Sequence, residues 1–206
     1  MRKTLDFFLD VGRLKGKKRR GWIINRIRNS ESTAEHIFRM AIISWVLSKK
    51  KRLDVKRVLK MALVHDLCEV YAEDITPYDP LLGDDAKENN RILKSWPKFS
   101  IKQKKDNIKW HAKVDRQGML KLLSGLPRDL RREMITSWEE FEQGNSREAK
   151  FVRQVDKFEN FLQGMEYCLS QGKIQYRLWF RWIKEIIDDP HLIKLVWEIE
   201  KKFKKK

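Results

Sequence analysis

The stretch VHDLCEVYAEDIT, residues 64–76, carries several polar side chains within an otherwise apolar run of helical character. A protein core does not normally contain such polar groups. The stretch contains the pair His65-Asp66, then Glu69, and finally Asp74 where the helix is expected to end. Residues three and four positions apart lie on one face of a helix, so we expect His65, Asp66 and Glu69 to share a face. Buried polar groups without partners are costly, and a divalent metal ion would supply the partner.

Two distant positions are candidates to complete such a site. His36 lies in the first turn of a helix expected over residues 32–48, which the capping-box pattern STAE opens. Asp156 lies beside the apolar stripe of a long helix expected over residues 145–170, with Asn145 as its cap. A single histidine on an apolar helix is more often a hydrogen-bonded core residue than a ligand, so this alternative stays open at this point.

The periodicity of the chain predicts an all-α fold. Apolar residues recur at helical spacing, and neither an alternating strand pattern nor a Gly-rich phosphate loop is visible. The helix over residues 32–48 is apolar on nearly every side, which is typical of the centre of a bundle. The next helix is expected over residues 55–71, and two peripheral helices are expected over residues 84–123. We predict one domain over residues 1–206, with a core over about 4–172, closing helices over about 176–204 and a basic tail.

Composition indicates a globular protein of a reducing compartment. Apolar residues make up 41% of the 206 residues, and eight of the residues are tryptophan. The two cysteines show neither metal-type spacing nor a disulfide framework. No signal peptide and no apolar run of membrane-spanning length is apparent. These features predict a soluble cytoplasmic protein without a membrane partner.

The charge is strongly basic. Lys and Arg number 46 against 29 Asp and Glu, which gives a net charge of +17. Such a field attracts polyanions, but we take lysines on the solvated faces of helices as the main cause of the charge. The basic run at residues 15–20 has two interpretations, as a solvated loop or as a phosphate-facing arm.

The order of these residues resembles the H…HD…D layout of the HD-domain phosphohydrolases. The segments GRLKGKKRRGW, NSESTAEHIFRMA, ALVHDLCEVYAEDITPYD, EAKFVRQVDKFENFLQGMEY and DDPHLIKLV are similar to the 5′-deoxynucleotidase branch of that superfamily. Together they span most of the chain. The resemblance implies an HD-domain helical bundle and an enzyme that uses a metal. Residues from about 95 to 113 resemble an extension relative to shorter members.

The resemblance also implies a set of site residues. The metal ligands would be His36, His65, Asp66 and Asp156, and this donor set suits one divalent ion such as Mn²⁺, Co²⁺, Fe²⁺, Zn²⁺ or Mg²⁺. Glu69 and Asp74 would be catalytic: we hypothesise that Asp74 positions or deprotonates the attacking water, and that Glu69 helps in proton transfer or holds the sugar. The two roles could be exchanged.

The basic run gains a function from the same resemblance. Arg19 would hold the phosphate and Trp22 would form a wall near the nucleotide, with Arg20 as an alternative to Arg19. The chain departs from close relatives at Gly21, which separates the arginines from the tryptophan, and at Glu73, where glycine is common.

The predicted function is a metal-dependent phosphomonoesterase that converts deoxynucleoside 5′-monophosphates to deoxynucleosides and phosphate. One alternative is another HD phosphohydrolase or phosphodiesterase that acts on a different nucleotide. A second is a basic nucleic-acid-binding protein with a vestigial site, which the presence of both Glu69 and Asp74 disfavours. The resemblance further implies a homodimer.

Overall fold

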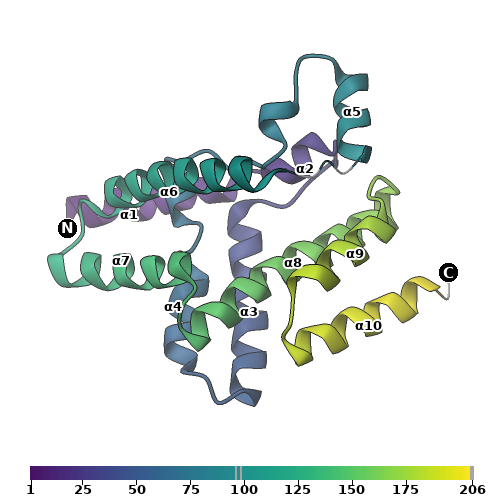
Figure 1. The fold of residues 1–206 in the computed structure, drawn as a ribbon. Coiled ribbons are helices and arrows are strands. Elements are labelled where there is room, and N and C mark those ends of the chain that lie inside the picture. The colour runs from purple at the N-terminus through teal and green to yellow at the C-terminus, as the bar shows by residue number, and fades with distance from the viewer. Residues whose placement is uncertain (96, 98, 205–206) are drawn as a thin grey trace. The chain divides into compact units, whose positions relative to one another are not determined.

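Helices make up the regular structure of this chain (Figure 1). The computed structural model describes residues 1–95, 97 and 99–204, without the side chains of residues 86, 101, 104–109 and 204. The elements are α1 (Arg2–Gly12), η1 (Arg13–Lys15), α2 (Arg20–Ile24), α3 (Thr33–Lys50), α4 (Val55–Val64), η2 (Leu67–Val70), η3 (Asp79–Leu81), α5 (Ala86–Ser95), α6 (Ile101–Leu123), α7 (Arg128–Gln143), α8 (Arg147–Gln171), α9 (Tyr176–Ile186) and α10 (Pro190–Lys204). No described residue belongs to a strand, so the predicted all-α class is confirmed.

The chain divides into two compact units, each made of two segments. The first unit comprises residues 1–34 and 66–135, and the second comprises residues 35–65 and 136–206. One boundary therefore falls between His65 and Asp66, inside the motif with which the sequence analysis began. The prediction of one domain over residues 1–206 stays a prediction, and residues 205–206 of its basic tail lie outside the described part.

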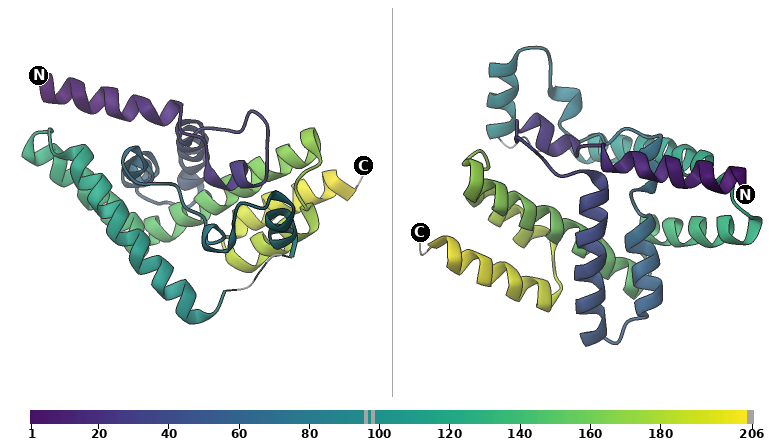
Figure 2. Two further views of the ribbon diagram at one scale, coloured as in Figure 1. Left: turned by 90° about the horizontal axis from the view of Figure 1, so that it is seen from above. Right: turned by 180° about the vertical axis from the view of Figure 1, so that it is seen from behind.

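In the first unit, α6 packs against the short 3₁₀-helix η2. Gly118 allows this approach, because a Cβ there would lie 2.7 Å from the backbone oxygen of Cys68. The neighbouring Met119, Leu122 and Leu123 are buried. The C-terminal end of α6 also meets the start of α1, as Figure 2 shows from above. The two helices expected over residues 84–123 are present, but the C-terminal part of α6 is core and the expectation of a purely peripheral position was wrong.

In the second unit, α8 is the central element, with α4 and α9 packed against it and α10 against α9. Its buried residues include Val152, Val155 and Phe161. The helix α3 runs antiparallel to α4 in Figure 1. Although nearly every side of α3 is apolar, Phe38 and Trp45 are 69% and 48% exposed. The expectation that α3 is enclosed on all sides was therefore wrong for this face.

Helix ends follow the local capping rules. Asp54 caps α4 by accepting from the Arg57 backbone nitrogen at 3.1 Å, and Asp189 accepts from the backbone of His191 at 2.9 Å before α10. Gly172 closes α8 in the left-handed conformation, with φ of 65°. The cap of α8 is Ser146, which accepts from the Ala149 backbone nitrogen at 3.0 Å, and not the predicted Asn145.

The predicted helix over residues 55–71 is interrupted. The α-helix ends at Val64 with His65 as its C-cap, Asp66 has φ −105° and ψ 11°, and η2 begins at Leu67. The expectation that Asp66 and Glu69 continue the helical face of His65 was wrong. In the segment that follows the break, the ammonium group of Lys17 contacts the carbonyl oxygens of Glu69 and Ala72 and so holds this segment within the first unit.

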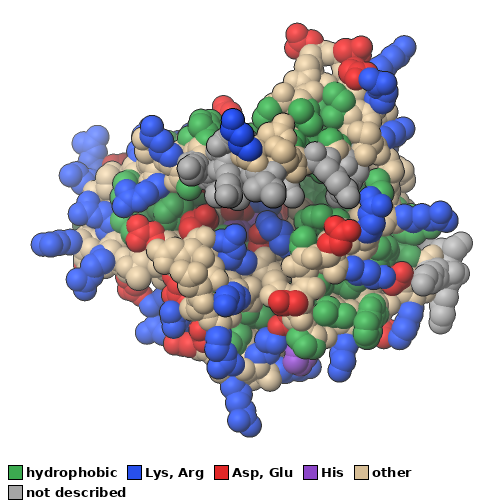
Figure 3. All heavy atoms as spheres, in the orientation of Figure 1, with side chains coloured by type: hydrophobic (Ala, Val, Ile, Leu, Met, Phe, Trp, Pro, Cys, Tyr) green, Lys and Arg blue, Asp and Glu red, His purple; other side chains and the backbone are tan. Residues whose placement is uncertain are grey.

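The distribution of apolar and charged residues bears on membrane insertion and on the origin of the net charge. Within the described residues, no helix combines the length and apolarity needed to cross a membrane. Figure 3 shows Lys and Arg side chains interspersed with acidic and apolar ones on the face in view. This distribution favours solvated helix faces as the source of the +17 charge.

Candidate metal centre and active site

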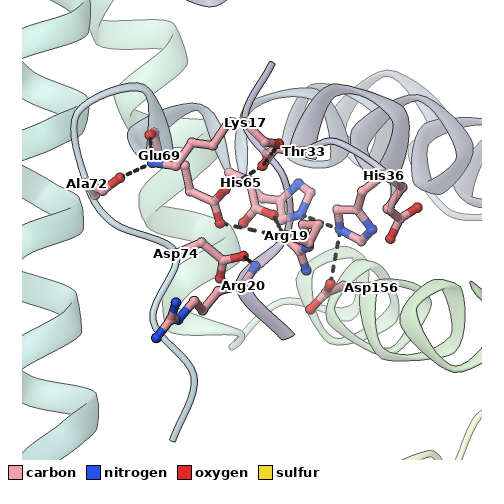
Figure 4. Close-up of polar contacts among 12 residues, drawn as sticks. Lys17, Arg19, Arg20, Thr33, His36, His65, Glu69, Ala72, Asp74 and Asp156 are labelled. Atoms are coloured by element: carbon pink, nitrogen blue, oxygen red, sulfur yellow. Dashed lines mark hydrogen bonds and ion pairs between the residues drawn. The ribbon is translucent and has the colours of Figure 1, made fainter. Parts of the chain in front are cut away.

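Three predicted ligands meet in the second unit. His36 comes from the first turn of α3, His65 from the C-cap of α4 and Asp156 from α8, and all three side chains are buried. The Nε2 atom of His36 lies 3.3 Å from Nε2 of His65 and 3.4 Å from Oδ1 of Asp156 (Figure 4). The cluster has the ligand types and spacing that could hold a metal ion.

The hydrogen bonds of the two imidazoles fit a cation between them. The carbonyl oxygen of Ala62 lies 2.9 Å from Nδ1 of His65, and since a carbonyl only accepts, this nitrogen carries the hydrogen. Nδ1 of His36 faces a carboxylate oxygen of Glu159 in the same way. Both Nε2 atoms of the neutral rings therefore direct lone pairs toward each other. A cation satisfies both lone pairs at once, which is the usual role of such an arrangement.

Asp156 adds a negative charge to this centre. Burial opposes its ionisation, yet the ammonium group of Lys157 at 2.8 Å holds the pKa of Asp156 well below its usual range. The carboxylate thus stays ionised over the physiological range. Two imidazole nitrogens and one carboxylate are a donor set that first-row divalent metals accept.

The fourth predicted ligand, Asp66, belongs to the first unit. It follows His65 directly in the chain, and its carboxylate pairs with the guanidinium group of Arg19. The same guanidinium nitrogen lies 3.6 Å from a carboxylate oxygen of Glu69. Arg19 thus joins the two acidic residues that the sequence analysis assigned to metal binding and catalysis.

Glu69 is buried, and its carboxyl group accepts a hydrogen bond from the Thr33 hydroxyl at 2.7 Å. Burial is the main reason that the pKa of Glu69 is raised to about 8, with the charges of Asp66 and Asp74 adding to the shift and Arg19 opposing it. A carboxyl group with such a pKa keeps its proton near neutral pH and can donate it.

The carboxylate of Asp74 lies at the N-terminus of α2. It accepts from the backbone nitrogen of Arg20 at 2.7 Å, whereas the side chain of Arg20 pairs with Asp79 at 2.6 Å. A cavity of about 410 Å³ adjoins these groups, a volume within the range of small-molecule sites. Its lining comprises Lys17, Lys18, Arg20, Ile23, Glu73, Asp74, Ile75 and Asp79.

Trp22 is a core residue of the first unit. Its side chain is 2% exposed, and its indole nitrogen donates to a carboxylate oxygen of Glu31 at 2.9 Å. This bond ties α2 to the chain just before α3, and the backbone nitrogen of Arg19 donates to the Glu31 carbonyl at 3.3 Å. Trp22 and the backbone of Arg19 are thereby both tied to Glu31.

Sequence reasoning missed three polar residues around these groups. Lys17 was considered only as part of a basic run, although it holds the backbone of η2. Arg39 and Glu159 contact each other at 2.7 Å, and Glu159 also contacts His36. A signal for the last two was present: each lies three residues after a predicted ligand, His36 or Asp156, and hence on the same helix face.

Comparisons with known proteins identify the family of this chain. The chain matches the HD domain family over residues 11–185. The human 5′-deoxynucleotidase HDDC2 is 34% identical over 166 residues, which cover 81% of this chain and 69% of the human protein. The Schizosaccharomyces pombe 5′-deoxynucleotidase hdd1 is 31% identical over 184 residues, covering 89% and 82% of the two chains.

Solved structures show the same fold. The crystal structure of a Pyrococcus horikoshii protein superposes with a TM-score of 0.63 at 26% identity, covering 95% of this chain and 97% of the other. A conserved hypothetical protein from Pyrococcus furiosus gives the same score at 24% identity. The chain belongs to the HD domain family, whose members are metal-dependent phosphohydrolases.

Proposed function

We propose that this protein is a metal-dependent phosphomonoesterase that hydrolyses deoxynucleoside 5′-monophosphates to deoxynucleosides and inorganic phosphate. The observation that carries the proposal is the buried convergence of the Nε2 atoms of His36 and His65 and the carboxylate of Asp156. The substrate class is taken from the relatives that are named 5′-deoxynucleotidases and match over most of this chain.

One divalent ion would be held by His36, His65 and Asp156, with Asp66 as the fourth ligand. Support for Asp66 comes from its position next to His65 in the chain and from the H…HD…D order. Mn²⁺, Co²⁺, Fe²⁺, Zn²⁺ and Mg²⁺ are the candidate ions. When bound, such an ion acidifies water and neutralises charge on a phosphoryl group.

Hydrolysis requires a proton to leave the attacking water and a proton to reach the departing O5′ oxygen. We assign the first role to the Asp74 carboxylate, which lines the 410 Å³ cavity. The second role suits Glu69, because its pKa of about 8 leaves it protonated at neutral pH. The water oxygen bonds to phosphorus, the P–O5′ bond breaks, and the nucleoside hydroxyl leaves with the proton of Glu69.

Arg19 is the candidate phosphate clamp. Its guanidinium group pairs with Asp66, the proposed fourth ligand, and lies near Glu69, the proposed proton donor, whereas that of Arg20 pairs with Asp79. A guanidinium fork matches the oxygens of a phosphate group. Trp22 would support Arg19 from the core, because its buried ring has little surface to offer a nucleotide.

We also infer a homodimer and a cytoplasmic location. The first inference rests on the resemblance to the 5′-deoxynucleotidases. The second is supported by Cys68 and Cys168, both of which are free thiols, as a reducing compartment would leave them.

The decisive experiment measures phosphate release from a panel of ribo- and deoxynucleoside 5′-monophosphates. The protein is stripped with EDTA, and Mn²⁺, Co²⁺ or Mg²⁺ is added back. We expect release only with metal and only from deoxy substrates. Asp66→Ala should abolish both metal binding and turnover, whereas Asp84→Ala, which removes an exposed carboxylate of the same unit, should leave both unchanged. Absence of release with every metal, in protein shown to bind metal, would contradict the proposal.

A further inference from the structure

Arg39 links α3 to α8 directly behind the histidine pair. It lies one helical turn after His36 and meets three residues on one face of α8. Its guanidinium nitrogens donate to Glu159 at 2.7 Å, to Gln163 at 2.5 Å and to Glu166 at 2.7 Å. All of these residues belong to the second unit.

Glu159 is the member of this group that reaches the centre. Its side chain is 0% exposed, so both carboxylate oxygens require partners. One oxygen, Oε1, accepts from Arg39, and the other, Oε2, faces Nδ1 of His36. The carboxylate therefore bridges a residue that can only donate and an imidazole nitrogen.

We propose that Glu159 is a positioning residue that holds His36 in the Nδ1–H tautomer, and that Arg39 holds Glu159 in place for this purpose. In that tautomer the Nε2 lone pair of His36 points toward His65 and Asp156, as metal binding requires. The inference rests on the metal site proposed above and adds the residues that prepare it. A carboxylate behind a ligand histidine fixes the ring and raises its basicity.

The arrangement predicts that Glu159→Gln, although it preserves the volume of the side chain, weakens the binding of a metal ion by His36. Arg39 can only donate, so the amide oxygen of the variant must face Arg39, and the amide NH₂ must then face His36. An NH₂ group needs an acceptor, and this stabilises the opposite tautomer, in which Nδ1 is bare and Nε2 carries the hydrogen. The nitrogen that should bind metal is then blocked, even though the volume of the side chain is unchanged.

Removal of Arg39 should release the constraint. In the double variant Arg39→Met with Glu159→Gln, the amide can turn its oxygen to His36. Its NH₂ group can then donate to the oxygen of Gln163, one turn along α8, which Arg39 no longer occupies. The double variant should therefore bind metal more tightly than the single variant, a result that simple loss of structure does not produce.

The test is the affinity of EDTA-stripped protein for Mn²⁺, measured by isothermal titration calorimetry. We expect roughly 10- to 100-fold weaker binding by Glu159→Gln and partial recovery in the double variant. Glu166→Gln is the matched control, because Glu166 contacts Arg39 but is 50% exposed and does not touch His36; it should bind Mn²⁺ like the wild type. Wild-type affinity in Glu159→Gln, or a double variant no tighter than the single one, would overturn the inference.

A measurement on the unmodified protein complements the variants. The ¹⁵N chemical shifts of His36 in the metal-free wild type at pH 8 should show a protonated Nδ1 and a bare Nε2. The reverse pattern overturns the inference even if Glu159→Gln does not fold. If the wild type does not bind Mn²⁺ at all, the proposed function fails with it, whereas intact Mn²⁺ binding by both wild type and Glu159→Gln overturns only the role of Glu159.

Discussion

Nε2 of His36 and Nε2 of His65 lie 3.3 Å apart, although the Nδ1 hydrogen of each ring is directed to a different acceptor. Two lone pairs at this distance repel each other, and burial prevents water from relieving the repulsion. The Asp156 carboxylate adds negative charge to the same space. A bound cation should convert this repulsion into a stabilising interaction.

Asp156→Asn is expected to remove most of the increase in the free energy of unfolding that metal binding produces. In the wild type, Mn²⁺ at 100 times its Kd should add about 2.7 kcal/mol to the free energy of unfolding. The variant loses the charged ligand and should show little of this gain. Differential scanning fluorimetry with and without Mn²⁺ measures the effect, and Lys150→Ala, an exposed change on the same helix, should respond to Mn²⁺ like the wild type. An unchanged response in Asp156→Asn would exclude Asp156 from the site.

Local rules predicted the framework around this centre. Asp54, Asp189 and Gly172 end or begin helices as their capping preferences indicate. His36 and Asp156 were selected as polar groups on apolar helices, and the structure places them 3.4 Å apart. Such predictions succeed because a cap, or a helix face, depends on residues within a few positions of each other.

Features that depend on distant contacts could not be read in this way. The α-helix ends at Val64, and the segment that follows is held by Lys17, 52 residues before Glu69, which contacts the carbonyl oxygens of Glu69 and Ala72. Glu159 looked like an ordinary charged residue, since only the fold shows that it is enclosed between His36 and Arg39. The different roles proposed for Arg19 and Arg20 are equally non-local. Only their tertiary contacts, Arg19 with Asp66 and Arg20 with Asp79, distinguish these two adjacent residues.

Arg19→Ala should mainly weaken substrate binding. The guanidinium group pairs with the carboxylate of Asp66 and lies 3.6 Å from that of Glu69. A hydrogen bond to a charged group contributes about 1.5–3 kcal/mol, so we expect a roughly 10- to 100-fold lower kcat/KM with most of the change in KM. Steady-state kinetics on a deoxynucleoside 5′-monophosphate provides the measurement. Arg20→Ala is the control, because its side chain pairs with Asp79. Equal effects of the two substitutions would argue against a specific clamp at Arg19.

Glu69 should make the stability of the metal-free protein depend on pH. Its pKa rises from the ordinary 4.5 to about 8 on folding, so the folded state binds the proton more tightly than the unfolded chain. The resulting stabilisation is complete below pH 4.5 and is lost as the pH rises through 8. Between pH 5 and 8.5 the free energy of unfolding of the wild type should fall, relative to Glu69→Gln, by on the order of a few kcal/mol.

Urea unfolding at several pH values measures this difference. Glu73→Gln serves as the control, because Glu73 is exposed in the same segment and its removal should leave the pH dependence intact. Parallel curves for the wild type and Glu69→Gln would show that Glu69 titrates normally in the folded protein, and the proton-donor role proposed for it would lose its basis.

Gly118→Ala should displace η2, the element that carries the proposed proton donor Glu69. The added Cβ would lie 2.7 Å from the Cys68 carbonyl oxygen and 3.3 Å from the Ala72 backbone nitrogen, and neither backbone atom can turn aside as a side chain could. α6 and η2 must therefore separate, which typically costs about 1–3 kcal/mol. Because η2 carries Glu69, we expect lower kcat as well as a lower free energy of unfolding. In Gly12→Ala, where no atom lies within 4 Å of the added Cβ, kcat should stay at the wild-type value and the free energy of unfolding should not fall. Wild-type stability and kcat in Gly118→Ala would mean that η2 tolerates displacement, and that the position of Glu69 does not depend on α6.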